Sequence, residues 1–330
     1  ISGPGLNAGW IEDGLPINTA SWDQSGTDII SDGEGGAVMV WSDYKNEGGY
    51  LYHDIYAQRV DRRGNILWNS GGIPICSTYY DQAHPKIVSD GTGGFIVVWS
   101  DNRTNTYYDV YAQRIDSDGN AIWTANGIPV CAESNHQYYP EILTADGGGA
   151  IIAWLDWRSD TSADIYCQKI DNNGSAQWTS TGVGVCVTSG IQEQVRIAKD
   201  GYGGFIAVWK DNRSSTDDIY FQQVTSSGSP NWGTEGSGLC TASGDQSMPQ
   251  IVECDYPGSA FVIWVDTRNG DADIYGTWYY SGYSNWGTNG ISICTESGNQ
   301  SYPVLHKYGA YSMIAAWRDF RGKSVWKIFS

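Results

Sequence analysis

The feature that most constrains the fold is a repeat marked by two series of tryptophans. In the first series each tryptophan stands in a W-x-D frame followed by a basic residue, and successive members are 58, 55, 55, 55 and 53 residues apart: Trp41, Trp99, Trp154, Trp209, Trp264 and Trp317. The second series keeps step with the first: Trp10, Trp68, Trp123, Trp178, Trp232 and Trp286. Repeats of this length are typical of solenoids, propellers and arrays. The fold of the chain therefore follows from the fold of one repeat.

One repeat, residues 82–131, contains four short segments with the properties of strands: residues 85–89, 95–100, 109–116 and 121–130. The second segment is a continuous apolar run, which fits a strand covered on both faces, and the third alternates between apolar and polar residues. The turns between them, S-D-G-T-G-G and D-S-D-G-N, carry glycine where the chain reverses. Four antiparallel strands per repeat predict an all-β fold, a β-propeller with one four-stranded blade per repeat.

The two ends of the chain complement each other. Residues 7–18 match the fourth strand of the later repeats, whereas the last repeat supplies three strands, around His306 and at residues 316–319 and 324–329, before the chain stops. We therefore expect residues 7–18 to complete a sixth blade and to close the ring, which leaves no open sheet edge. Residues 1–330 would then form a single six-bladed domain with blades at 19–76, 77–131, 132–186, 187–240, 241–294 and 295–330 plus 7–18.

Charge and hydropathy restrict the partners. The formal net charge of −18 makes nucleic acid and anionic membranes unfavourable partners. No apolar run approaches the roughly 18 residues that a membrane-spanning helix needs. Ile1 has the character of a trimmed start, so we expect a monomeric fragment of a larger multidomain protein, extracellular or at the cell surface.

Five of the seven cysteines occupy one repeat position, where the first copy has Asn18: Cys76, Cys131, Cys186, Cys240 and Cys294. A disulfide needs Cα atoms within about 7 Å, and equivalent positions at the ends of outer strands in a ring are farther apart. We expect these five, together with the off-register Cys167 and Cys254, to be free, and the five to be small buried apolar groups. No C-x-x-C motif is present to suggest zinc or redox chemistry.

The acidic turns resemble calcium-binding loops, and calcium is therefore an alternative to a tight hairpin. A calcium loop needs several oxygen ligands and usually a distal carboxylate. The sister turns at Asp61 and Asp171 lack the second acid but keep the glycine. Turn geometry is thus what recurs, and we expect no cofactor.

Each W-x-D aspartate is followed two residues later by a base, and another aspartate opens the next strand. The aspartates are Asp43, Asp101, Asp156, Asp211, Asp266 and Asp319, and the bases are Lys45, Arg103, Arg158, Arg213, Arg268 and Arg321. A carboxylate and a guanidinium can pair at the base of each loop between the second and third strands. The favoured interpretation is a repeated structural ion pair, and the alternative is six equivalent ligand clefts.

The loops between blades and between second and third strands vary in length and carry aromatic residues outside the core pattern. Variable loops on a rigid scaffold often hold function. The candidate ligand residues are Trp22, Tyr79, Tyr80, Tyr107, Tyr108, Tyr138, Tyr139 and Trp157, with Tyr50 and Tyr52 in the same loops and Gln82 and Gln137 from the glutamine that enters each first strand. Such rings suit sugars or protein surfaces, and plain loop packing is the alternative. For the glutamines we prefer a structural role in the turn.

Catalytic signals are weak. A glycosidase or lyase needs one asymmetric set of groups, whereas the prominent acids here are repeated six times. The four histidines, His53, His84, His136 and His306, have no evident partner in the sequence. The residues therefore favour a non-enzymatic binding or spacer module. The alternatives are a multivalent lectin with sites between blades and a carbohydrate-active hydrolase or lyase with one site at the channel mouth.

The repeat resembles the propeller repeats of large exported bacterial proteins. The resemblance lies in D-I-Y-A-Q-R-V-D at residues 54–61, G-I-P-I-C at 72–76, D-Q at 81–82, S-D-G-T-G-G at 89–94 and W-S-D-N-R at 99–103. It covers essentially the whole chain and implies a propeller, export, and a glycan or protein partner on a surface. It carries no activity over to particular residues.

Overall fold

The computed structural model describes residues 14–47, 50–159, 161–321 and 327–329. Every regular element in this part of the chain is a β-strand. The chain divides into two compact units, one of residues 1–154 with 168–181 and the other of residues 155–167 with 182–330. The described residues include no helix that is long and apolar enough to cross a membrane.

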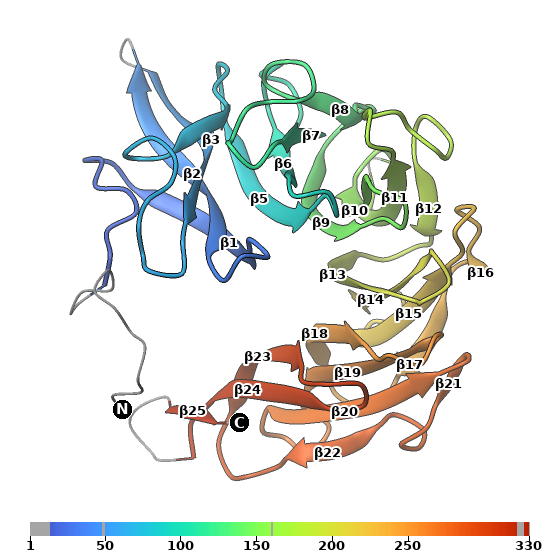
Figure 1. Ribbon diagram of the computed structural model, residues 1–330. Helices are drawn as coiled ribbons and strands as arrows, with labels where there is room; N and C mark the ends of the chain where they lie inside the picture. The colour runs from blue at the N-terminus through green and yellow to red at the C-terminus, as the bar shows by residue number, and fades with distance from the viewer. Residues whose placement is uncertain (1–13, 48–49, 160, 322–326, 330) are drawn as a thin grey trace. The chain divides into compact units, whose positions relative to one another are not determined.

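The first unit contains two complete antiparallel sheets (Figure 1). The first sheet is β1 (Gln24–Ser31), β2 (Ala37–Glu47), β3 (Tyr50–Val60) and β4 (Ile73–Cys76), in that order. The second is β5 (Gln82–Ser89), β6 (Phe95–Asp101), β7 (Asp109–Ile115) and β8 (Ile128–Cys131). The division between the units runs through the third sheet, which is β9 (Gln137–Thr144), β10 (Ala150–Asp156), β11 (Asp164–Ile170) and β12 (Val183–Cys186).

The second unit contains the remaining three sheets. The fourth sheet is β13 (Gln192–Lys199), β14 (Phe205–Asp211), β15 (Asp218–Val224) and β17 (Ser237–Cys240), with β16 (Asn231–Thr234) before its last strand. The fifth is β18 (Gln246–Glu253), β19 (Ser259–Asp266) and β20 (Asp273–Tyr280), and β20 pairs with both β21 (Tyr283–Ser284) and β22 (Ile291–Cys294). The sixth is β23 (Gln300–Lys307), β24 (Met313–Asp319) and β25 (Lys327–Phe329).

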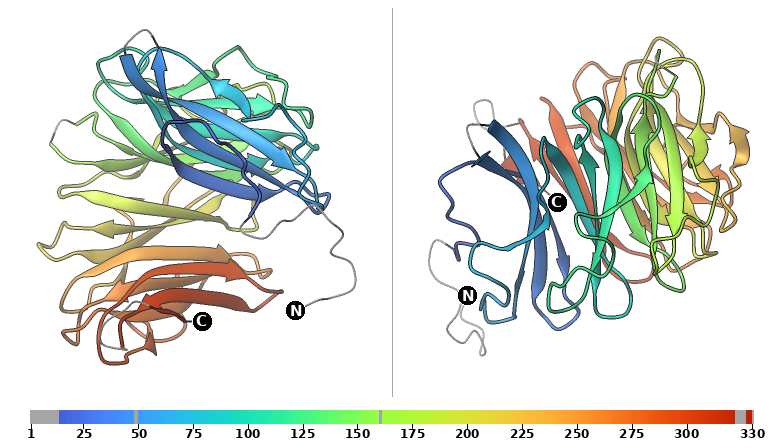
Figure 2. Two further views of the ribbon diagram at one scale, coloured as in Figure 1. Left: turned by 90° about the vertical axis from the view of Figure 1, so that its left-hand side faces the viewer. Right: turned by 90° about the horizontal axis from the view of Figure 1, so that it is seen from above.

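The core lies between successive sheets. All seven residues of β6 are buried, which explains its continuous apolar sequence. In the first unit β5 contacts β1, β2 and β3, and Trp99, Phe95 and Val97 pack with Val38 and Val40. In the second unit β23 lies along β18, β19 and β20 (Figure 2). Each large side chain buried in this way contributes about 1.5–3 kcal/mol.

The first strand of each sheet contains an irregularity that the sequence did not predict. In β5 the register shifts between Ala83 and Lys86, and His84 between them has φ 56°. The same left-handed position recurs in every first strand: Gly26, Tyr139, Gln194, Met248 and Tyr302. A bulge of this kind re-aims a side chain and increases the local twist.

The fourth strand is shorter than predicted. In the second sheet the expected strand at residues 121–130 is wrong in extent, because only β8 (Ile128–Cys131) and a single bridge from Ile115 to Ala121 are paired. Gly127 interrupts the segment with φ 84°, and a Cβ there would lie 2.5 Å from Cη2 of Trp99. The chain therefore turns over the edge of the indole ring before the strand begins.

The all-β architecture with six antiparallel sheets is confirmed. The closing strand expected at residues 7–18 stays a prediction. Residues 14–18 belong to no strand, and residues 7–13 lie outside the described part of the chain.

Candidate functional site

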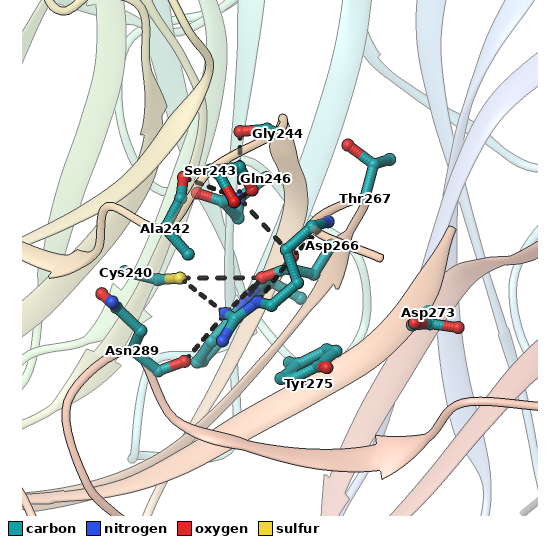
Figure 3. Close-up of polar contacts among 12 residues, drawn as sticks. Cys240, Ala242, Ser243, Gly244, Gln246, Asp266, Thr267, Asp273, Tyr275 and Asn289 are labelled. Carbon is teal, nitrogen blue, oxygen red and sulfur yellow. Dashed lines mark hydrogen bonds and ion pairs between the residues drawn. The ribbon is translucent and has the colours of Figure 1, made fainter. Parts of the chain in front are cut away.

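The W-x-D aspartate of each repeat lies in a buried polar cluster. In the second sheet, Asp101 accepts hydrogen bonds from Trp99 Nε1 at 2.7 Å and from Arg103, whose Nε and Nη2 donate at 2.9 and 2.6 Å. The guanidinium also stacks on Tyr111, 3.7 Å from the ring centre. Figure 3 shows the equivalent cluster around Asp266, with Tyr275 below it. Because both carboxylate oxygens are occupied, this cluster supports the structural interpretation rather than six ligand clefts.

The charge of this cluster is stabilised inside the protein. Burial disfavours the ionised form of Asp266, but the bonds from Arg268 and Trp264 outweigh it and lower the pKa of Asp266. In the sixth sheet the bond from Arg321 lowers the pKa of Asp319 to about 2. The ion pair is made within one strand end, between residues two apart.

The repeated cysteines belong to the same cluster. Arg268 Nη2 donates to Cys240 Sγ at 3.0 Å, and this sulfur lies 3.6 Å from Asp266 Oδ2 (Figure 3). Burial raises the pKa of the Cys240 thiol to about 12, so the thiol stays protonated. The expectation of purely apolar packing is therefore wrong for Cys240, which has polar neighbours. All seven cysteines are buried thiols.

The repeated glutamines hold the turn that precedes each first strand. Gln82 is fully buried, and its Nε2 donates to Tyr80 O at 2.8 Å and to Thr78 Oγ1 at 2.9 Å. Gln137 is also fully buried and donates to Asn135 O at 3.0 Å. Neither side chain can therefore contact a ligand at the surface. Their place among the candidate ligand residues is corrected in favour of the structural role.

The acidic turns use their carboxylates within the hairpin. Asp90 Oδ1 accepts from Thr92 N at 2.7 Å and from Gly94 N at 2.9 Å, and its Oδ2 accepts from Arg114 Nε at 2.8 Å. Within the described part of the chain, no group of three or more His, Cys, Asp or Glu side chains is placed to hold a metal ion.

A cavity of about 550 Å³ opens among the variable loops of the first unit. Its walls come from the start of β3, the β4–β5 loop and the β6–β7 loop: Leu51, Tyr52, Tyr79, Tyr80, Asp81, Asn102, Arg103 and Asn105. Tyr79 is 72% exposed and Tyr80 is 42% exposed, whereas Tyr52 is buried. The rings of Tyr52 and Tyr79 meet edge to face with centres 6.2 Å apart. Exposed ring faces and polar groups therefore share one concave site.

Asp81, which lines this cavity, forms a carboxylate–imidazole pair with His53, whose ring packs on Tyr44 behind the lining. Asp81 Oδ1 lies 3.0 Å from His53 Nδ1 and also accepts from the His53 backbone N at 3.1 Å. A carboxylate oxygen can only accept, so in a hydrogen bond between these two atoms the imidazole Nδ1 is the donor. Burial and then the charge of Asp81 raise the pKa of Tyr108 to about 12, which places that hydroxyl within the field of the same carboxylate.

Two further groups face this site. Arg103 lines the cavity, and its bonds to Asp101 are made through Nε and Nη2. Asn102 Oδ1 is buried and has no hydrogen-bond donor among the described residues. Buried polar atoms are normally satisfied, so this oxygen suits a donor supplied by water or by a ligand.

The other predicted ligand residues lie outside the cavity lining. Tyr107, Tyr108 and Tyr138 surround His136, with ring centres 4.9–6.1 Å from its imidazole. Tyr139 packs on His84 at 4.2 Å. Trp22 meets Tyr44 edge to face. Trp157 is half-buried and belongs to the second unit. Of the loop aromatic residues named from the sequence, the described lining of the cavity contains Tyr79 and Tyr80, together with Tyr52.

The sequence did not single out Asp81, His53, Asn102 or Asn105. The residue before the repeated glutamine has the same structural role in several repeats: its side chain accepts a hydrogen bond from a backbone N of the preceding loop, as Asp81 does from His53 N. His136 accepts from Tyr108 N, and Asn299 accepts from Ala272 N. The contact between the His53 imidazole and the Asp81 carboxylate joins residues 28 positions apart in the sequence, so the repeat pattern could not predict it.

Comparison with known proteins gives fold relatives only. No protein-family model matches the chain, and no curated protein matches it. A protein of unknown function from Dyadobacter fermentans aligns with a TM-score of 0.51 and 10% identity over 94% of each chain. The GH93 α-L-arabinofuranosidase of Fusarium graminearum aligns with a TM-score of 0.51 and 10% identity over 81% of this chain and 84% of that one. A PL25 ulvan lyase aligns with a TM-score of 0.55 and 10% identity over 91% of this chain and 77% of that one.

These likenesses identify the fold as a β-propeller. They also bear on the predicted function, because the two relatives above with named activities are carbohydrate-active enzymes. The prediction of a non-enzymatic binding or spacer module is contradicted by this finding, which favours the hydrolase or lyase alternative.

Proposed function

We propose that the chain is an enzyme that cleaves a polysaccharide and that the cavity of the first unit binds the sugar chain. The observation that carries the proposal is the composition of this cavity. The rings of Tyr79 and Tyr80 can stack on sugar faces, while Asp81, Asn102 and Asn105 can bond hydroxyl groups. Its volume of about 550 Å³ lies in the range of ligand sites.

The chemistry of the cavity favours a lyase over a hydrolase. A hydrolase needs two carboxyl groups on either side of the glycosidic bond, and Asp81 is the one carboxylate in the described lining. Burial and the charge of Asp101 raise the pKa of nearby Asp109 to about 6, as a catalytic acid would require. The pKa values of the equivalent Asp164 and Asp218 are raised too, so this shift belongs to the scaffold rather than to a catalytic pair.

Elimination from a uronic acid residue fits the remaining groups. Arg103 and Asn105 donate hydrogen bonds to the substrate carboxylate, and the withdrawal of its charge acidifies the proton on the adjacent carbon. His53, oriented by Asp81, removes that proton, and its electron pair forms a carbon–carbon double bond as the glycosidic C–O bond breaks. The Tyr80 hydroxyl supplies the proton that the leaving oxygen takes up. No water is consumed.

A panel of uronate-containing and neutral polysaccharides tests this reaction. The expected result is ultraviolet absorbance from an unsaturated uronate product, together with new reducing ends. His53→Gln and Arg103→Lys should each lower kcat at least about 100-fold, as expected for loss of a general base or a charge-stabilising group. His306→Gln, at an exposed position of the second unit, is the matched control and should cleave like the wild type.

Two other outcomes decide against the lyase. New reducing ends without ultraviolet absorbance would identify a hydrolase at the same site if His53→Gln abolished them. A folded wild-type protein that cleaves no polysaccharide in the panel would refute the proposed function.

We further propose that the six sheets are the blades of one closed propeller of the exported bacterial repeat type, with residues 7–18 as the missing strand of the sixth blade. Support comes from Asn18, whose Nδ2 lies 3.5 Å from Asp43 Oδ1. Cys76, at the end of the first blade, lies on Asp101 of the second blade in the same way. Asn18 thus has the same position relative to the first blade as Cys76, the last residue of the first blade, has relative to the second. An exported, monomeric protein with a polysaccharide partner is consistent with this assignment.

A further inference from the structure

A cluster of exposed tyrosines gathers on three consecutive hairpins of the second unit. These hairpins join the first and second strands of the fourth, fifth and sixth sheets. The tyrosine patch consists of Tyr202, Tyr256, Tyr308 and Tyr311 on these hairpins, which are 64%, 46%, 69% and 67% exposed, and of the half-buried Tyr280 at the end of β20. The corresponding hairpins of the first three sheets, residues 32–36, 90–94 and 145–149, contain no aromatic residue. The tyrosines are therefore an addition to the repeat and not part of its fold.

The hairpins that carry the patch are fastened to one another by backbone hydrogen bonds. Gly258 N donates to Asp200 O at 2.7 Å, which joins the fourth and fifth sheets, and Asp255 N donates to Ala310 O at 3.1 Å, which joins the fifth and sixth. Lys307 adds ion pairs to Asp255 and Glu253. The rings are thus displayed on a connected backbone, which lowers the conformational entropy lost on binding.

The rings and hydroxyl groups of the patch lie close together. Tyr256 and Tyr280 meet edge to face with centres 5.0 Å apart, and their hydroxyl oxygens are 3.3 Å apart. The Tyr202 hydroxyl donates to Pro257 O at 3.3 Å. The pKa of Tyr256 is raised, mainly by the hydrogen bond between its hydroxyl and that of Tyr280. Electrostatic interactions with Tyr202 and Tyr311 raise it further. Tyr202, Tyr256 and Tyr280 therefore lie together, and the hydrogen bond from Asp255 N to Ala310 O brings the hairpin of Tyr308 and Tyr311 beside them.

We infer that the tyrosine patch is a second carbohydrate-binding surface that holds another segment of the polysaccharide cleaved at the cavity; the identity of the ligand rests on the proposed function. Tyrosine offers both a ring face for stacking on a sugar and a hydroxyl for its polar groups. Lys307 pairs with Asp255 and Glu253 beside the rings and offsets their charge. Exposed aromatic clusters of this kind mark interaction sites on soluble proteins.

A second contact with one polymer changes how the enzyme uses long and short substrates. Binding at the patch keeps the polymer attached while the cavity releases and rebinds it, which raises the effective substrate concentration. A short oligosaccharide that fills only the cavity gains nothing from the patch. The patch therefore affects polymer binding and cleavage but not oligosaccharide cleavage.

Affinity electrophoresis through gels that contain each polysaccharide of the panel tests this inference. A variant with Tyr202→Ala, Tyr256→Ala and Tyr311→Ala should lose gel retardation by about tenfold or more in apparent affinity. It should cleave short oligosaccharides like the wild type. The matched control is Tyr302→Ala, an exposed tyrosine of β23 outside the patch, which should be retarded normally. An unchanged thermal unfolding midpoint shows that the triple variant is folded.

The outcomes separate this inference from the proposed function. If the folded triple variant is retarded like the wild type, or if no polysaccharide retards the wild type, the patch is not a carbohydrate surface. If the wild type cleaves nothing but is retarded in a manner that the triple variant loses, the proposed enzyme fails while the patch stands. Should the triple substitution unfold the protein, Tyr311→Ala alone supplies the test, because this ring is exposed.

Discussion

At the scale of single residues, the most informative groups are buried carboxyls with opposite pKa shifts. Burial and the nearby charge of Asp101 raise the pKa of Asp109 to about 6. A carboxyl whose pKa is higher in the folded than in the unfolded state destabilises the fold once it is ionised. The destabilisation is therefore complete above about pH 6 and absent below about pH 4.

Replacement of Asp109 by Asn should remove this destabilisation without changing the shape of the side chain. We expect the free energy of unfolding to rise by about 1–2 kcal/mol near pH 7.5 and to stay unchanged near pH 4. Urea titrations at the two pH values measure the difference. A variant no more stable than the wild type near pH 7.5 would show that the ionised carboxylate costs the fold nothing.

Asp266 should behave in the opposite sense. Its pKa is lowered because the bonds from Arg268 and Trp264 outweigh burial, so its contribution is present above the unfolded pKa and is lost as the pH falls through the lower folded value. Asp266→Asn leaves the guanidinium without its buried counter-charge and should cost about 3 kcal/mol near pH 7. Denaturant unfolding measures this, with the exposed Asp118→Asn as the control that should change little. Equal stability of the two variants would be evidence against a structural role for the cluster.

At the scale of the element, the glycine before the fourth strand is the position most open to a controlled test. Gly127 has φ 84°, and an added Cβ would lie 2.5 Å from Cη2 of Trp99. Gly93 also has a positive φ, 98°, but no atom would lie within 4 Å of its Cβ. Gly93→Ala should therefore cost about 1 kcal/mol from backbone strain alone, whereas Gly127→Ala should cost about 3 kcal/mol or more.

The difference between these two variants isolates the clash with the indole ring. Thermal or urea unfolding gives both values under the same conditions. If Gly127→Ala were no worse than Gly93→Ala, the packing of Trp99 under the turn would not be what sets the start of β8.

The repeat made the elements predictable because each strand is specified locally. The continuous apolar run of β6 and the glycine hairpins can be read from the residues of a single copy. The boundaries of β8 could not be read in this way, because they depend on the contact between Gly127 and a ring 28 residues earlier in the chain. The bulge at His84 was missed for a similar reason, since non-glycine residues with positive φ leave no consistent pattern in sequence.

The candidate site was only partly predictable because some of its contacts join residues that are far apart in the sequence. Tyr79 and Tyr80 stood out because they break the repeat, and they do line the cavity. The structural role preferred for Gln82 followed from its recurrence, whereas the direction of its amide, which points into the turn, could not be read from the sequence. The pairing of His53 with Asp81 arises only when β3 and the β4–β5 loop come together.

At the scale of the whole molecule, the proposed closure of the ring makes a strong prediction about the N-terminal segment. Residues 7–18 carry Trp10, Ile11, Leu15 and Ile17, and a large apolar side chain buried in a sheet contributes about 1.5–3 kcal/mol. Removal of residues 1–18 should therefore lower the free energy of unfolding by several times this amount. It should also leave the edge of the sixth sheet unpaired, which favours association between copies.

Removal of residues 1–6 alone is the matched control, since it leaves the proposed strand intact. Urea unfolding combined with size-exclusion chromatography should show a less stable, self-associating protein for the longer deletion and wild-type behaviour for the shorter one. The contact of Asn18 with Asp43 gives an independent check, because Asn18→Ala removes this contact and leaves the rest of the segment in place. A small loss for Asn18→Ala and a large loss for the long deletion would show that the strand, rather than this one amide, closes the sheet. If the long deletion remained monomeric and as stable as the wild type, the N-terminal residues would have no part in the sixth blade and the ring would have to close in another way.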